Sequence, residues 1–134
     1  MTEKGSDELE NLLVHHVSVV FLSVLAFVEL AAAVGRLLRQ NSIKREEAAK
    51  LLVEVDNDWS NLYLRIPLTD DIADRAASLA LEHPLKGADA VHLASSESAA
   101  VDLFVCSDRS LIQSAEGLGL SVYNPEDGLF KLSR

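Results

Sequence analysis

The stretch from Val17 to Gly35 constrains the fold more than any other part of the chain. It reads VSVVFLSVLAFVELAAAVG and carries a single charged side chain, Glu29. A run of this length could cross a bilayer, but the residues before it are acidic rather than basic, which disfavours a signal peptide. Burying the Glu29 charge in lipid would cost about 2–3 kcal/mol. Because the run divides into a β-branched part, Val17–Phe21, and a helix-forming part after Ser23, we expect a buried strand followed by a helix and no membrane span.

Strand and helix signals alternate along the rest of the chain. Ser23 and Ser42 each stand where a helix N-cap is expected. Thr69, Asp70 and Asp71 are expected to open a further helix. Four short apolar segments read as strands, near residues 17–21, 62–66, 103–106 and 120–123. Because parallel strands need helical crossovers, the sequence predicts one α/β domain over residues 1–134. We expect a mostly parallel sheet with helices on both faces.

Composition limits the partners of such a domain. The formal net charge is −9, so the chain has no general attraction for nucleic acid. A polyanionic substrate would require a local basic patch or bound cations to offset the field. The only cysteine, Cys106, lies in an apolar run and is expected to be a buried small side chain. No intrachain disulfide is possible and no Cys/His spacing suggests zinc, which favours a cytoplasmic setting.

Three carboxylates stand out by their position. Glu29 lies in the helix that follows the first strand, Asp89 lies at the start of a helix, and Asp108 directly follows the third strand. Each has an ordinary interpretation when it is taken alone. Glu29 could mark the solvent edge of a half-buried helix, Asp89 could favour a helix N-terminus, and Asp108 could be an N-cap.

Taken together, the three acids predict a shared site. Ligands of parallel sheets bind at the carboxyl ends of the strands, where all three acids could converge. Two carboxylates about 4 Å apart repel by about 4 kcal/mol at an effective dielectric near 20. A cation would offset this repulsion. Because oxygen ligands without Cys or His suit hard ions, the pattern favours Mg²⁺ or Mn²⁺.

Three motifs occur in order along the chain. They are Ser23-x-Leu25-x-x-x-Glu29, Lys86-Gly87-Ala88-Asp89-Ala90-Val91-His92-Leu93-Ala94 and Phe104-Val105-Cys106-Ser107-Asp108-Arg109-Ser110-Leu111. They resemble the motifs of PIN-domain ribonucleases, in particular the VapC toxins of VapBC toxin–antitoxin pairs. The resemblance implies a three-layer α/β/α sandwich with a mostly parallel sheet and an endoribonuclease site that uses Mg²⁺ or Mn²⁺. It also implies an RNA substrate, an antitoxin protein partner and a homodimer.

Carried over by motif, the resemblance assigns roles to particular residues. It places the catalytic and metal-binding acids at Glu29, Asp89 and Asp108, with Ser107 and Ser23 in supporting positions. His92 follows Asp89 by three residues and therefore lies on the same helical face. We expect His92 to be an ordinary satisfied or half-exposed histidine rather than a ligand.

The chain departs from the family pattern at its beginning. The family normally begins with a strand that ends in an acidic ligand, whereas this chain begins Met1-Thr2-Glu3-Lys4-Gly5, which resembles the segment after that strand. We therefore expect an N-terminally truncated member with weakened metal binding and cleavage, and an assembly larger than a monomer. A catalytically inactive PIN-like module that engages an antitoxin or another protein is the alternative. A flavodoxin-like phosphate-binding domain is disfavoured because no glycine-rich loop follows a strand.

Overall fold

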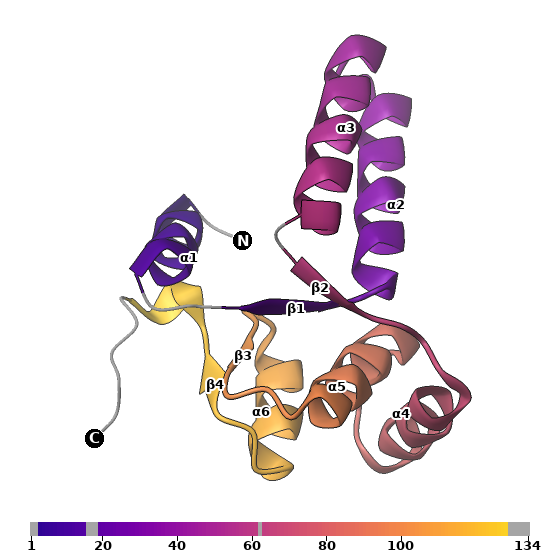
Figure 1. Cartoon of the computed structure of the whole chain (residues 1–134), viewed down its shortest axis with the longest axis vertical. Helices are drawn as coiled ribbons and strands as arrows, with labels where there is room; N and C mark the ends of the chain where they lie inside the picture. The colour runs from indigo at the N-terminus through magenta and orange to yellow at the C-terminus, as the bar shows by residue number, and fades with distance from the viewer. Residues whose placement is uncertain (1–2, 16–18, 62, 129–134) are drawn as a thin grey trace.

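A computed structural model of the chain describes residues 3–15, 19–61 and 63–128 (Figure 1). Helices and short strands alternate along these residues, as the sequence predicts. In chain order the elements are α1 (Glu3–His15), β1 (Val20–Ser23), α2 (Leu25–Arg39), α3 (Arg45–Asn61), β2 (Tyr63–Ile66), α4 (Asp70–Glu82), α5 (Gly87–Ala99), β3 (Phe104–Val105), α6 (Arg109–Gly117), β4 (Val122–Tyr123) and the 3-10 helix η1 (Pro125–Asp127). Among these helices, none combines the length and the apolar character that crossing a membrane requires.

The α/β class is confirmed, and the strand pairs are parallel. β1 pairs with β2, with Ser23 opposite Ile66, and β3 pairs with β4, with Phe104 opposite Val122. The expectation of a single sheet is wrong in one respect, because the described strands form two separate two-stranded ladders. α5 contacts β1 and also contributes Leu93 to the core that holds Phe104. The two ladders are therefore joined by side-chain packing on α5 rather than by hydrogen bonds.

The strand positions are close to those predicted, but the helix caps differ. Residues 17 and 18 of the first predicted strand lie outside the described residues. The N-cap of α2 is Val24, whose side chain makes no cap bond, and the Ser23 hydroxyl accepts the Leu25 N–H at 3.3 Å. Ser42 is not an N-cap, because α3 begins at Arg45 and its first backbone acceptor is the Lys44 carbonyl, which accepts from the Ala48 N–H at 3.0 Å. The Ser42 backbone N–H instead donates to the Leu37 carbonyl at the end of α2, at 2.9 Å.

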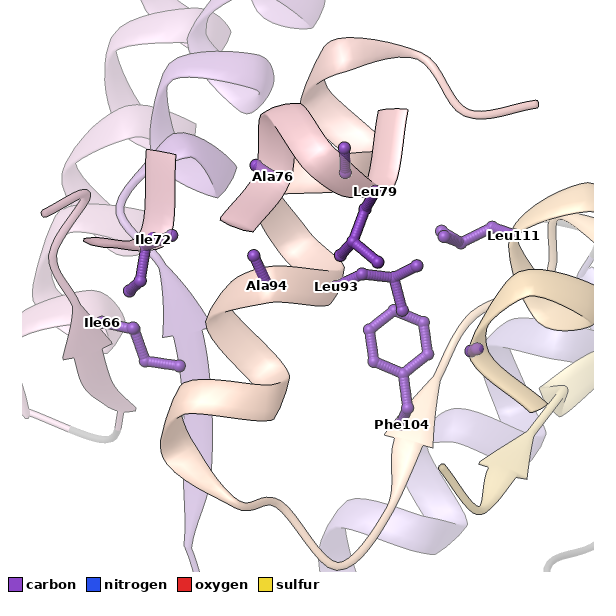
Figure 2. Close-up of a cluster of buried hydrophobic side chains, with 10 residues drawn as sticks. Ile66, Ile72, Ala76, Leu79, Leu93, Ala94, Phe104 and Leu111 are labelled. Atoms are coloured by element: carbon purple, nitrogen blue, oxygen red, sulfur yellow. The ribbon is translucent and has the colours of Figure 1, made fainter. Parts of the chain in front are cut away.

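The core lies between α4, α5, α6 and the strands beside them. Leu79, Leu93 and Ala115 have no exposed surface, and Phe104 is 8% exposed. Figure 2 shows Leu79, Leu93 and Phe104 pointing toward one another from α4, α5 and β3. Thr69 begins α4 as predicted, because its hydroxyl accepts the Ile72 N–H at 3.2 Å. This packing holds the first turn of α5 in place.

The hairpin formed by α2 and α3 projects away from α4, α5 and α6 (Figure 1). The two helices contact each other, and α3 also contacts β2. The hairpin contributes few side chains to the interior, of which Val34 and Ala48 are the buried apolar examples among the described residues. It is therefore attached to the domain mainly at its base.

Candidate functional site

The ends of two parallel strands position the predicted acids. β1 ends at Ser23 and leads directly into α2, which carries Glu29 one turn from its start. β3 ends at Val105, and Asp108 follows as the N-cap of α6. Asp89 lies in the first turn of α5, the helix that packs against β1. The three acids thus come from three helices that begin near the carboxyl ends of the strands.

Electrostatics connects these three carboxylates. The pKa of Asp89 is raised above its ordinary value of 3.8, first by partial burial and then by the negative charge of Asp108, with Glu29 adding to the effect. Coulombic interactions with His92 and with Lys86 lower the pKa of Asp89 and so act in the opposite direction. Because a neighbouring charge shifts a pKa only at short range, Asp89 lies within the field of both other acids. Their role as metal ligands stays a prediction.

Glu29 has a hydrogen-bond partner that the sequence did not indicate. Its Oε1 accepts a hydrogen bond from Nε2 of His92 on α5. The Glu29 side chain is 49% exposed and the His92 side chain 23% exposed, so the pair lies at the surface of the site. His92 is a satisfied histidine, as predicted, and its contact joins the hairpin to α5. The helical spacing of His92 from Asp89 placed both on one face of α5, but it did not indicate Glu29 as the partner of His92.

Asp108 caps a helix in addition to its electrostatic contact with Asp89. Its Oδ1 accepts the Leu111 N–H at 2.9 Å, so the ordinary interpretation of Asp108 as an N-cap is correct. A carboxylate has two oxygens, and Oδ2 can still accept from another group. Ser107, the predicted supporting hydroxyl, is partly buried directly before Asp108. Ser23, the other supporting residue, is 5% exposed at the end of β1.

Cys106 lies beside these acids and is only partly buried, which corrects the expectation of a buried side chain. Burial raises the pKa of its thiol to about 11, and the charges of Asp108 and Asp89 act in the same direction. A hydrogen bond from the Asp108 backbone opposes this shift. The thiol is therefore protonated at neutral pH and is a poor nucleophile.

The donor chemistry suits a hard cation, but the acids do not form a closed coordination shell. Within residues 3–15, 19–61 and 63–128, no three His, Cys, Asp or Glu side chains are close enough together to hold one ion. Mg²⁺ commonly uses only one or two protein carboxylates and keeps several of its waters. The residues therefore fit an open site with few protein ligands rather than a fully enclosed one.

An acidic site at the carboxyl ends of parallel strands in a small α/β domain is an arrangement that suits metal-assisted nucleases. A family model described as the PIN domain matches residues 2–117. The chain belongs to the PIN-domain family.

Two curated relatives are similar to most of the chain. They are Ribonuclease VapC45 of Mycobacterium tuberculosis (strain CDC 1551 / Oshkosh) and Ribonuclease VapC49 of Mycobacterium tuberculosis (strain ATCC 25618 / H37Rv). Each is 34% identical over 97 residues, which cover 70% of this chain and 64% of the relative. The chain thus matches less than two thirds of the length of either relative.

Proposed function

We infer that this PIN domain carries a VapC-type endoribonuclease site that hydrolyses RNA phosphodiesters. The observation that carries the proposal is the environment of Asp89, a partly buried carboxylate in the fields of Asp108 and Glu29. Gathering like charges costs stability, and a function that requires a cation explains why the chain does so. The ribonuclease names of the two relatives support the same activity.

The cofactor in this proposal is Mg²⁺ or Mn²⁺, bound directly by one or two of the acids Asp89, Asp108 and Glu29 and through its remaining waters by the others. A bound divalent cation would supply positive charge to a phosphodiester during its hydrolysis. Ser107 and Ser23 would support the acids from the ends of β3 and β1. Because the described acids do not form a closed group, we expect weak metal binding and slow cleavage.

The proposed setting is cytoplasmic, with RNA as substrate, an antitoxin protein as partner and a homodimer as the assembly. Apolar side chains on β1 and β2 support a protein partner. Phe21 is 40% exposed and Leu64 is 54% exposed. The same surface favours the second candidate function, a catalytically inactive module that engages an antitoxin, because such a module needs the apolar surface but no metal.

A metal-dependence assay on purified protein decides between the two functions. We expect slow cleavage of RNA with Mn²⁺ or Mg²⁺, none with EDTA, and loss of cleavage in Asp89→Asn. Asp102→Asn is the matched control, because Asp102 is an exposed acid close to β3. Cleavage that persists in EDTA or in Asp89→Asn would refute the proposed site. Cleavage by none of the proteins, with antitoxin binding intact, would favour the inactive module.

A further inference from the structure

Positive charge is concentrated in one part of this acidic chain. Residues 36–50 contain five of the twelve Lys and Arg side chains and only two acids, Glu46 and Glu47. This segment carries a net charge of +3. Because the whole chain carries −9, the residues outside the segment together carry −12. The five side chains, termed the hairpin cations, are Arg36, Arg39, Lys44, Arg45 and Lys50.

The hairpin cations lie together at the tip of the α2–α3 hairpin. Arg36 and Arg39 are in the last turn of α2, Lys44 and Arg45 are at the start of α3, and Lys50 follows little more than one turn later. Figure 1 shows this tip at the end of the hairpin far from β1. All five are exposed. The ion pairs among the described residues are Arg75–Glu97 and His92–Glu29, so the hairpin cations remain available to an external anion.

Helix stability explains only part of this arrangement. Cations in the last turn of α2 are favourable, because the helix dipole places negative charge there. Lys44 and Arg45 stand at the start of α3, where the dipole is positive and a cation is unfavourable. Glu46 and Glu47 would stabilise that helix start without them. The position of Lys44 and Arg45 therefore indicates a use other than the stability of the hairpin.

The face of α2 connects the hairpin cations with the acidic site. Arg36 follows Glu29 by seven residues, close to two helical turns, so both lie on one face about 10 Å apart along the axis. Ala32 and Ala33 lie between them on that face, and their small side chains do not project far from the helix surface. A phosphate backbone anchored at Arg36 could therefore pass along α2 to Glu29 without meeting a large side chain.

We propose that the hairpin cations form an RNA-docking surface that leads the phosphate backbone along α2 to the acidic site. The proposal rests on the ribonuclease function proposed above and identifies the local basic patch that an acidic chain needs to attract a polyanion. Contacts to phosphates supply most of the sequence-independent affinity of proteins for nucleic acid. The surface therefore sets affinity and direction rather than sequence preference.

The test is RNA binding measured without cleavage. Anisotropy of a short fluorescein-labelled oligouridine is titrated in EDTA at several salt concentrations, with the wild-type chain, Arg36→Gln/Arg39→Gln and Lys44→Gln/Arg45→Gln. Each pair is expected to weaken binding on the order of ten-fold at low salt, and to reduce the slope of log affinity against log salt by about 1.4. The first pair removes cations that favour a helix and the second removes cations that oppose one, so a shared defect cannot come from hairpin stability.

Ala73→Glu/Ala80→Glu is the matched control, because it lowers the net charge by the same two units at exposed positions of α4. The salt slope of this control should equal that of the wild type. The proposal is overturned if the control weakens binding as much as the hairpin pairs do, or if neither hairpin pair changes binding. It is also overturned if polyglutamate or anionic vesicles displace RNA as well as unlabelled RNA does, because the surface would then serve another acidic partner.

Failure of catalysis and failure of docking give different results. In an Asp89→Asn background, each hairpin pair should still weaken oligouridine binding in EDTA by the same factor, because the hairpin cations act on phosphates remote from Asp89. A wild-type chain that cleaves no RNA with Mn²⁺, but whose binding is weakened in both hairpin pairs, would retain the docking surface and lose the proposed activity. A wild-type chain that cleaves RNA while both pairs bind normally would retain the activity and overturn the docking surface.

Discussion

The α2–α3 hairpin and the α4–α6 region are built differently. The buried cluster of the described residues runs from Ile66 to Ala115 and draws on α4, α5 and α6. In the hairpin, Val34 and Ala48 are buried, whereas Val28 and Val53 are 58% and 66% exposed. Burial of apolar area is the main source of fold stability. The α4–α6 region therefore holds the fold together, and the hairpin leaves its side chains available for binding.

The candidate site lies where these two regions meet. Asp89 and Asp108 belong to α5 and α6, whereas Glu29 belongs to the hairpin and reaches α5 through His92. Regions with few buried contacts open more easily than a packed core. The site thus combines two acids on a rigid support with a third on a more adaptable one.

The largest expected effect separates the two regions by stability. Leu79→Ala in α4 should lower the free energy of unfolding by about 2–5 kcal/mol, because Leu79 is fully buried and its truncation leaves a cavity. Leu51→Ala in the hairpin is the matched change at a side chain that is 38% exposed, and it should cost less than about 1 kcal/mol. Urea unfolding measures both values. Equal losses would contradict the contrast between the two regions.

Asp89→Asn should raise the melting temperature by a few degrees at pH 7. The pKa of Asp89 is raised, so its charged form destabilises the folded state at pH values above that pKa, and asparagine removes this cost. The advantage should shrink as the pH falls through the raised pKa of Asp89 and vanish below its ordinary value of 3.8. Thermal unfolding across pH tests the sign. A less stable Asp89→Asn at pH 7 would mean that the charge is already compensated in the free protein.

His92→Ala should loosen the hairpin locally without unfolding the domain. Loss of the contact with Glu29 removes one connection between α2 and α5. Native-state amide exchange should accelerate in α2 and remain unchanged in α4, which Ile72, Ala76 and Leu79 anchor in the core. Faster exchange in both helices would show that the two regions open as one unit.

The smallest expected effect concerns an ion pair within the rigid region. Arg75 on α4 and Glu97 on α5 form two hydrogen bonds, of 2.9 and 3.1 Å, with side chains 43% and 28% exposed. Because exposed pairs contribute little, Glu97→Gln should lower the unfolding free energy by roughly 0.2–1 kcal/mol, and less in 1 M salt. Glu116→Gln on α6 is the exposed control. If Glu97→Gln lowered the unfolding free energy as much as Leu79→Ala does, the ion pair rather than apolar packing would be the main stabilisation between α4 and α5.

The sequence was sufficient to predict the local features of this fold. Hydrophobic periodicity located the strands and α2, and the Thr69 and Asp108 caps follow from short-range hydrogen bonds that their sequence context specifies. The order of Glu29, Asp89 and Asp108 along the chain was the basis on which the sequence predicts a shared site, and their role as its ligands stays a prediction.

Features that depend on long-range packing could not be predicted in the same way. The separation of the strands into two ladders depends on how α5 packs against β1 and against the core around Phe104. The contact of His92 with Glu29 depends on the crossing of α2 and α5, which no local pattern encodes. Ser42 has the residue type of an N-cap, but its backbone N–H donates to the Leu37 carbonyl at the end of α2. Where α2 ends therefore decides the role of Ser42.

Mn²⁺ binding to the purified chain tests most directly whether acids from the two regions form one site. Titration calorimetry or electron paramagnetic resonance should detect one weakly bound ion, with affinity lowered by Glu29→Gln in the hairpin and by Asp89→Asn in α5. Because residues in one site are coupled, the double variant should lose less than the sum of the two single losses. Asp102→Asn should bind as the wild type does. Unchanged affinity in either Glu29→Gln or Asp89→Asn would contradict a site shared between the hairpin and the α4–α6 region.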